Sequence, residues 1–176
     1  APELRTLTPM GHTLVMGIIN VTPDSFSDGG MWLGTSAAVG HGLDLIAQGA
    51  KILDVGGEST RPGAERVSEE EEMTRVMPVI EGLRIPAAAT GVALSVDTMR
   101  SSVARAAVRA GASIVNDVSG GLADTGMLGA VAELGVDYIC QHWRGFGSEM
   151  NRAAEYDDVV AEVRAELEAR CRAAVD

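Results

Sequence analysis

The segments QGAKILDVGG (residues 48–57) and RAGASIVNDVSGG (residues 109–121) repeat one pattern. Each contains Gly-Ala, a short apolar run, an Asp or Asn, and then Val followed by glycines. Glycine commonly ends a helix, and a short apolar run bounded by turn residues is typical of a buried strand. Each copy therefore predicts a helix end, a buried strand and a polar side chain at the strand's carboxyl end. LGVDYICQHW (residues 134–143) is a looser third copy.

The rest of the chain continues this alternation of strands and helices. Ser68, with a glutamate three residues later, forms a capping box that marks one helix start. Strands that alternate with helices predict a parallel sheet with right-handed crossovers, whose strands are buried on both faces. The expected strands are 12–20, 51–55, 92–97, 113–117 and 137–143, and the expected helices are 35–50, 68–84, 100–111, 123–135 and 156–175.

Two architectures fit this pattern, namely a (β/α)₈ barrel and a doubly wound open sheet. No Gly-x-Gly-x-x-Gly loop follows a strand, which weakens the dinucleotide-binding form of the open sheet. Polar residues end all five expected strands, at the edge where barrels carry active sites and open sheets bind ligands. These residues are Asn20, Asp54, Asp97, Asn116 and His142. The pattern favours the barrel and leaves the open sheet as the alternative.

The composition describes a globular, acidic protein of 176 residues with a net charge of −11. Nucleic acids and anionic membranes bind basic surfaces, so neither is expected as a partner. An anionic substrate would need a local arginine, a metal ion or a helix N-terminus. Neither a signal segment nor a long apolar run is evident, and free thiols are favoured over a disulfide for Cys140 and Cys171. We therefore expect a cytoplasmic protein.

Three strand-end side chains are candidates for binding a small molecule. Asp97 could be a ligand or could cap the helix that follows it. Asn116 offers a donor and an acceptor on one group, which suits the edge of an amide-like heterocycle, although a turn role is equally compatible. Asp54 lies in an apolar run, so it needs a hydrogen-bond donor beside it.

The glycine-rich loop 56–64 adds a candidate anion site. Its Thr60 hydroxyl and Arg61 guanidinium could bind an oxyanion. The alternative is a surface turn in which Arg61 is solvated or paired with Glu58. For His142, a core position is favoured over a ligand role.

Four segments, in order, resemble the dihydropteroate synthase family. MGIINVTPDSFSDGG (16–30) and LDVGGESTRPGA (53–64) resemble its two signature segments. SVDTMR (95–100) and GASIVNDVSGG (111–121) are similar to its third and fourth strand ends. HWR and VVAEVRAEL, within residues 142–167, look actinobacterial.

The resemblance implies a TIM barrel and a transferase reaction. Enzymes of this family condense 6-hydroxymethyl-7,8-dihydropterin pyrophosphate with p-aminobenzoate, with Mg²⁺, and release 7,8-dihydropteroate and pyrophosphate. The complete family member is expected to be a homodimer and a target of sulfonamides, which mimic p-aminobenzoate.

The resemblance also implies roles for individual residues. The pterin would be bound by Asp54, Asp97, Asn116 and Gln141. Asn20 would contact the metal ion with its pyrophosphate. Thr60, Arg61 and Asp97 would take part in catalysis.

The first two loops would form the p-aminobenzoate site. Phe26 would be an aromatic wall for the ring, within a loop otherwise built of turn-forming residues. Ser27, Thr60, Arg61 and Pro62 would complete that site.

The chain departs from the family in length and in one position. Residues 1–176 are expected to form one pterin-binding domain with about five of the eight βα units of a barrel. The family's pterin-binding lysine and late anion site have no counterpart, since Lys51 begins a strand. Gln141 stands where many relatives have an apolar residue. A pterin-binding module of methyltransferase type and a catalytically inactive fragment therefore remain alternatives.

Overall fold

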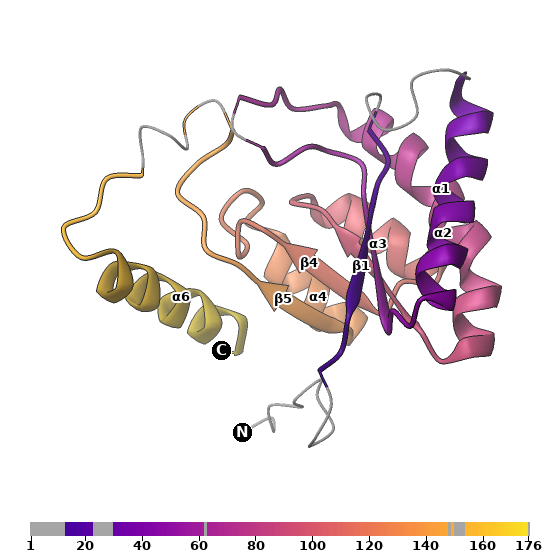
Figure 1. Ribbon diagram of the computed structural model, residues 1–176. Helices are drawn as coiled ribbons and strands as arrows, with labels where there is room; N and C mark the ends of the chain where they lie inside the picture. The colour runs from indigo at the N-terminus through magenta and orange to yellow at the C-terminus, as the bar shows by residue number, and fades with distance from the viewer. Residues whose placement is uncertain (1–12, 23–29, 62, 148, 150–153, 176) are drawn as a thin grey trace.

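A computed structural model describes residues 13–22, 30–61, 63–147, 149 and 154–175. Its centre is one sheet of five parallel strands that pair in the order β1-β2-β3-β4-β5. The strands are β1 (Met16–Asn20), β2 (Ile52–Gly56), β3 (Ala93–Asp97), β4 (Ile114–Asp117) and β5 (Asp137–Cys140). Because all strands run the same way, their carboxyl ends and the loops that follow gather at one edge, at the top of Figure 1.

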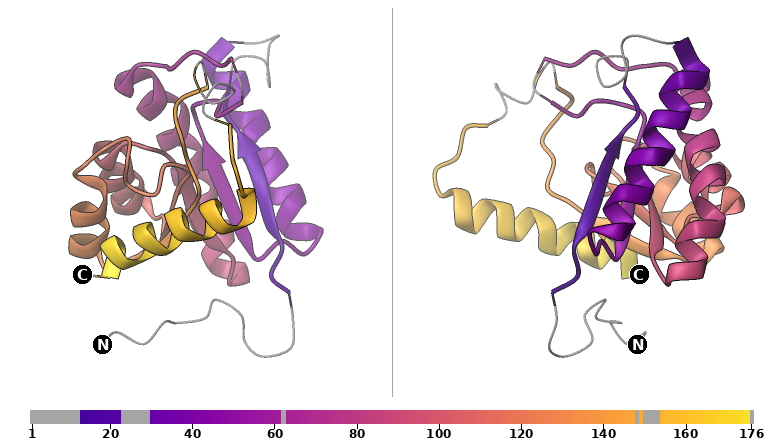
Figure 2. Two further views of the ribbon diagram at one scale, coloured as in Figure 1. Left: turned by 90° about the vertical axis from the view of Figure 1, so that its left-hand side faces the viewer. Right: turned by 45° about the vertical axis from the view of Figure 1, so that its right-hand side comes forward.

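Helices follow the strands in strict alternation. Figures 1 and 2 show α1 to α4 packed on one face of the sheet, whereas α6 lies apart from them beyond β5. The helices are α1 (Gly30–Ala47), α2 (Glu69–Thr90), α3 (Ser101–Ala110), α4 (Met127–Leu134) and α6 (Val159–Val175). Sequential pairing of parallel strands, with one layer of helices outside them, is the arrangement of consecutive units of a (β/α)₈ barrel. The doubly wound alternative is wrong, since its strand order reverses at a switch point, whereas β1 to β5 pair in sequence.

The hydrophobic core lies between the sheet and this helical layer. Along each strand, alternate side chains point toward the helices. The residues that do so include Ile19, Leu53, Val55 and Val96, and they meet Val76, Val79, Ile80, Leu83 and Val103 of α2 and α3. The intervening residues face the other side, where Ile18 is 50% exposed. The polar residues at the strand ends share this second face, so packing of the core leaves them available to a ligand.

The Ser68 cap at the start of α2 is confirmed, because its hydroxyl accepts a hydrogen bond from the Glu71 amide, whereas the Glu71 carboxylate pairs with Arg75. The predicted end at residue 84 is wrong. The helix continues through Pro86 to Thr90, and Gly91 ends it in the left-handed conformation. Burial of Ala87 against the core keeps the last turns in place despite the missing proline N–H.

Helix α6 carries an apolar stripe along one side that is not buried. None of its described residues is buried, and Val159, Val163, Leu167 and Cys171 line a shallow apolar groove. Both cysteines are free thiols, as predicted, although Cys171 is exposed rather than buried. Burial and the nearby Cys171 thiol raise the pKa of Cys140 to about 11. No helix in the described ranges has the length and apolar character needed to cross a membrane.

The αL conformation of Gly91 generates a stability prediction. Its φ is +67°, and a Cβ there would meet no atom within 4 Å, so Gly91→Ala tests backbone conformation alone. We expect the free energy of unfolding to fall by about 1 kcal/mol. Gly129→Ala is the matched control, since that exposed helical position is equally open. It should gain about 0.5–1 kcal/mol in urea unfolding. Equal effects of the two substitutions would contradict the assignment.

Candidate functional site

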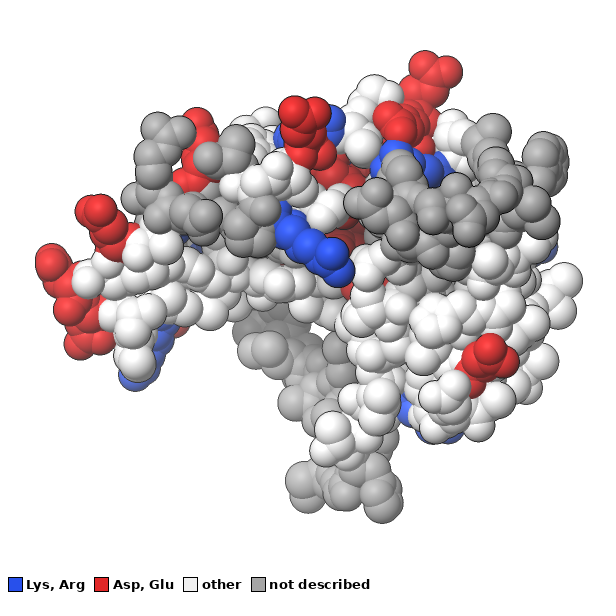
Figure 3. Space-filling model, turned by 45° about the horizontal axis from the view of Figure 1, so that its top comes forward, with Lys and Arg blue, Asp and Glu red and all other residues white. Residues whose placement is uncertain are grey.

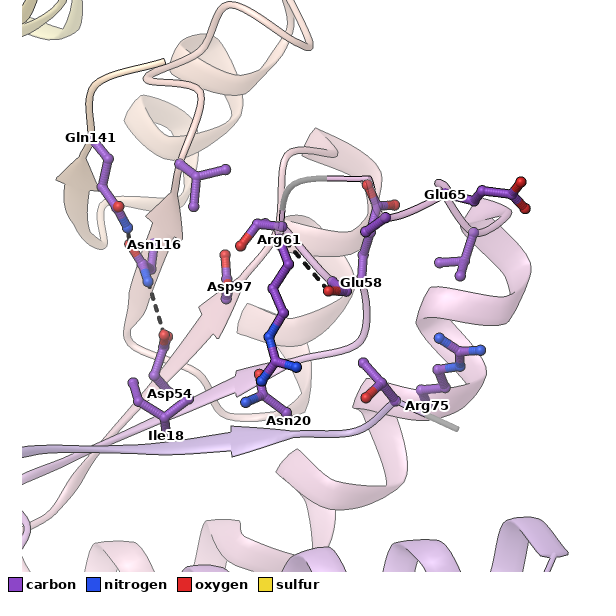
Figure 4. Close-up of a pocket in the computed structure, with 16 residues that line it drawn as sticks. Ile18, Asn20, Asp54, Glu58, Arg61, Glu65, Arg75, Asp97, Asn116 and Gln141 are labelled. Atoms are coloured by element: carbon purple, nitrogen blue, oxygen red, sulfur yellow. Dashed lines mark hydrogen bonds between the residues drawn. The ribbon is translucent and has the colours of Figure 1, made fainter. Parts of the chain in front are cut away.

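A pocket of about 720 Å³ lies at the carboxyl edge of the sheet. Side chains from the ends of β1 to β4 form its floor, and the β2–α2 connection forms a wall (Figure 4). The volume is in the range of sites for small organic ligands. Seven of the residues singled out from the sequence line it, namely Asn20, Asp54, Thr60, Arg61, Asp97 and Asn116, together with Gln141 from the segment after β5.

A chain of hydrogen bonds crosses the pocket floor. Gln141 donates from Nε2 to the Asn116 side-chain oxygen (2.7 Å), and Asn116 donates from Nδ2 to Asp54 Oδ2 (2.8 Å). The prediction that Asp54 needs a donor is thus confirmed. Its other oxygen, Oδ1, is buried and has no partner among the described residues. Burial raises the pKa of Asp54, and the neighbouring Ser95 and the bond from Asn116 oppose that rise. Asp54 Oδ1 and the neighbouring Ser95 Oγ are both shielded, so the floor offers a ligand the remaining hydrogen-bonding capacity of Asn116 and the Asp97 carboxyl group.

Asp97 does not cap the helix that follows it. Arg100 occupies the N-cap position of α3, but its side chain makes no capping bond to the helix. The Thr98 hydroxyl accepts a hydrogen bond from the Arg100 amide at 3.1 Å. The capping alternative for Asp97 is wrong because Thr98 already fills that local role. The Asp97 carboxyl group instead faces the pocket (Figure 4).

Asp97 is the strongest acid–base candidate in the pocket. Burial raises its pKa to about 7. The negative charges of Asp54, Glu72, Asp117 and Glu58 add to the effect, because a second carboxylate nearby disfavours ionisation. Asp97 can therefore exchange a proton near neutral pH. A cationic or N–H-rich ligand beside it would favour the ionised form of its carboxyl group.

The anion-site candidates lie at the mouth of the pocket. Asn20, Thr60 and Arg61 are exposed and line it together. In Figure 4 the Arg61 side chain reaches across the opening toward Asn20. Glu58 pairs with Arg66 and Arg100, so the expected alternative of an Arg61–Glu58 pair is wrong. The Arg61 charge thus remains directed at the opening.

The sequence analysis missed a buried ionic cluster behind this wall. Glu58 and Glu72 are both buried, and each pairs with Arg100, while Glu72 also accepts from the Thr98 hydroxyl at 2.6 Å. Glu72 belongs to a run of glutamates that the sequence presents as a solvated helix start. Its partners are 26 and 28 residues away along the chain, which local patterns cannot reveal.

A second missed residue shapes the loop after β4. Asp117 is fully buried and accepts from the Ser119 amide (2.8 Å), the Ser119 hydroxyl (2.7 Å) and the Gly121 amide (2.7 Å). Tyr138 also donates to it, at 2.9 Å, and its pKa is raised by burial and by the Asp117 charge. Asp117 therefore acts inside the loop, while its neighbour Asn116 faces the pocket.

His142 does not belong to the core. It is half-buried, and its Nε2 lies 2.7 Å from Glu166 Oε2 of α6. Arg144 bonds to the same glutamate and to Glu162, and its guanidinium stacks over Tyr156. The favoured core interpretation is wrong because these residues anchor α6 to the segment after β5 by polar contacts.

Charge and metal-binding capacity limit what the site can do. On the face in Figure 3, acidic side chains spread along the rim, and basic ones gather at a few places, including the central recess. Among the described residues no group of three His, Cys, Asp or Glu could hold a metal ion. Phe26, Ser27 and Pro62 lie outside the described residues.

Comparison with known proteins gives consistent matches. The family model described as pterin binding enzyme matches residues 16–176. Dihydropteroate synthase of Mycobacterium leprae is 54% identical over 87% of this chain and 53% of its own length. The Bacillus subtilis enzyme of the same name is 48% identical over 93% of this chain and 54% of its own.

Solved structures match equally well. The dihydropteroate synthase of Xanthomonas albilineans with 4-aminobenzoic acid has a TM-score of 0.81 and 54% identity, over 92% of this chain and 55% of that one. The Yersinia pestis enzyme in a sulfonamide complex has a TM-score of 0.81 and 40% identity, over 92% and 57%. The chain thus spans about half the length of these relatives. Its fold corresponds to the matched half of their structures.

The raised pKa of Asp97 predicts how stability changes with pH. An ordinary Asp has a pKa of 3.8, so the folded state binds more protons than the unfolded state between about pH 4 and 7. Stability contributed by this group is therefore lost as the pH rises through that window. Asp97→Asn should raise the free energy of unfolding at pH 8 by about 2 kcal/mol and change it little at pH 4.

Urea unfolding at several pH values measures this effect. Asp44→Asn, on the exposed face of α1, is the matched control and should leave the pH dependence unchanged. A variant at position 97 that retains the parent's decline above pH 4 would contradict the assignment.

Proposed function

We propose, because the chain belongs to the family of pterin-binding enzymes, that it provides the pterin-binding part of a dihydropteroate synthase of folate biosynthesis. That enzyme condenses 6-hydroxymethyl-7,8-dihydropterin pyrophosphate with p-aminobenzoate. The observation that carries the proposal is the hydrogen-bonded chain from Gln141 through Asn116 to Asp54, with the Asp97 carboxyl group beside it on the pocket floor.

The pterin ring matches the groups on the pocket floor. Its aminopyrimidinone edge has several N–H donors beside a carbonyl acceptor. The carboxylate of Asp97 would accept those N–H groups, and Asp54 would hold Asn116 in place from behind. Asn116 uses one amide hydrogen and one lone pair within the floor, so a second hydrogen and a second lone pair remain for the ligand. Hydrogen bonds to buried charged groups are the strong ones, which supports selective binding of this heterocycle.

The mouth of the pocket suits the pyrophosphate. Arg61 brings positive charge and Thr60 a hydroxyl donor, in a protein that is strongly acidic overall. Mg²⁺ typically takes one or two protein ligands together with substrate phosphates and waters, so it does not need a group of three acidic, His or Cys side chains, and the described residues contain none placed to hold an ion. The Asn20 amide oxygen would be the protein's ligand. When bound, the ion would neutralise charge on the departing pyrophosphate.

The reaction would then proceed by displacement at the pterin methylene carbon. The amine nitrogen of p-aminobenzoate forms a bond to that carbon as the carbon–oxygen bond to pyrophosphate breaks. The bonding electrons leave with pyrophosphate, and the product amine loses a proton. Phe26 would form an aromatic wall for the incoming ring, with Ser27, Thr60, Arg61 and Pro62 beside it.

The remaining expectations belong to the same proposal. Residues 1–176 would act as one pterin-binding domain of a homodimer in the cytoplasm, without nucleic acid or membrane as partners. The net charge of −11 supports the last two points, because both partners require a basic surface.

The deciding experiment measures pyrophosphate release from the pterin substrate by the full chain with Mg²⁺. Release that depends on p-aminobenzoate and is suppressed by a sulfonamide is the expected result. Pterin binding without such release would favour a pterin-binding module of methyltransferase type. A folded chain that binds neither substrate would be an inactive fragment.

Substitutions on the pocket floor test the pterin assignment. Asn116→Ala and Asp97→Ala should each weaken binding of 6-hydroxymethylpterin by about 10- to 100-fold, since each removes hydrogen bonds to the ring. Gln48→Ala, an exposed amide outside the pocket, is the control and should leave affinity unchanged. Isothermal titration calorimetry measures the affinities, and near-normal binding by both pocket variants would refute the assignment.

A further inference from the structure

We propose that Glu58 and Arg100 are positioning residues that set the geometry of Thr60 and Arg61. Neither touches the reacting atoms. Their buried ion pair fixes the connection between β2 and α2, residues 57–68, against α3. This inference rests on the proposed function, which identifies the substrate affected by Thr60 and Arg61 as the incoming amine, p-aminobenzoate.

Glu58 begins this connection and has both carboxylate oxygens occupied. Its Oε2 accepts from Arg100 Nη1 at 2.6 Å, and its Oε1 accepts from Arg66 Nε at 2.8 Å. The side chains of Glu58 and Arg100 are only 6% and 16% exposed. A buried carboxylate held by two guanidinium groups has one orientation, so the backbone at residue 58 is fixed with it.

Arg100 binds the end of the same connection. Its Nη2 donates to the Val67 carbonyl oxygen at 2.6 Å, and its Nη1 also pairs with Glu72 of α2. Thr98 bonds to Glu72 at 2.6 Å and holds that glutamate in place. One guanidinium therefore joins both ends of the connection, whose exposed middle carries Thr60 and Arg61.

The outer side of the connection rests on the segment after β5. The Gly63 amide donates to the Gly147 carbonyl oxygen at 2.8 Å, and Arg66 stacks over the Phe146 ring at 4.5 Å. A Cβ at Gly147 would lie 2.6 Å from the Arg61 carbonyl oxygen, so the two backbones approach closely. Figure 1 shows these two connections side by side above the strands. The connection is thus held from below by Arg100 and from the side by residues 146–147.

This arrangement separates the two substrates. The pterin groups Asp54 and Asn116 sit on strands, whose positions do not depend on the connection. Thr60 and Arg61 depend on it entirely. Loss of the Glu58–Arg100 pair should therefore affect the amine step and spare pterin binding, since small displacements of positioning groups slow a bimolecular reaction strongly.

Glu58→Gln is the main test, because it keeps the shape and removes the charge. We expect the KM for p-aminobenzoate to rise about tenfold. The affinity for 6-hydroxymethylpterin should change less than twofold. Amide hydrogen exchange within residues 57–67 should become faster while β2 to β4 stay protected. Arg100→Lys should recover part of the lost function relative to Arg100→Met, since lysine keeps the charge but not the fork of donors.

Glu133→Gln is the matched control. Glu133 pairs with Arg105 at 2.7 Å, but its side chain is 68% exposed and lies outside the pocket. All three measurements should match the parent. If Glu58→Gln fails to fold, Arg66→Met serves instead. It removes the partner of Glu58 Oε1, and the Arg66 side chain that it replaces is 35% exposed. That variant should also speed exchange in residues 57–67.

Two outcomes would overturn the proposal. One is unchanged exchange in residues 57–67 of both variants. The other is an equal loss of pterin and p-aminobenzoate binding, which indicates general destabilisation. If the parent shows no turnover, the proposed function fails, and hydrogen exchange still decides whether Glu58 and Arg100 hold the connection.

Discussion

The hydrogen bond from Asn116 to Asp54 depends on the curvature of the sheet, and the pocket depends on both. The two residues belong to β4 and β2, which are separated by β3. Neighbouring strands lie about 4.8 Å apart, so these strands are about 10 Å apart in the hydrogen-bonding direction. Two short side chains can close to 2.8 Å across that gap only where both point into the concave face. A curved parallel sheet, with its helices outside, is the geometry of a barrel wall.

Curvature also concentrates negative charge. Asp97 and Asp117 end β3 and β4, Asp54 lies within β2, and the buried Glu58 and Glu72 are near Asp97. Burial raises the pKa of Asp54, Glu72 and Asp97, and nearby negative charge adds to the rise at Glu72 and Asp97. Arg100 relieves part of it by pairing with both glutamates. The charge that remains on the pocket floor is available to a ligand rich in N–H donors, so the arrangement sacrifices stability for binding.

Local patterns predicted much of this fold and about half of the site. Strand ends, the Ser68 cap and the parallel sheet follow from periodicity and turn chemistry within short windows. The extension of α2 beyond Pro86 does not, because tertiary burial of Ala87 overrides the local signal. His142 was misplaced for the same reason, since its partner Glu166 lies on a helix 24 residues away.

The Glu58–Arg100 pair marks the limit of such inference. The two residues are 42 positions apart in the sequence. Taken with its sequence neighbours alone, each would be interpreted as a charged residue on the surface. Only the register of β2 beside β3 brings the starts of their following connections together. Pairing of strands therefore determines more than the floor of the pocket. It also determines which connections can brace one another, and so it couples a rigid recognition surface on the strands to reactive groups carried on a loop.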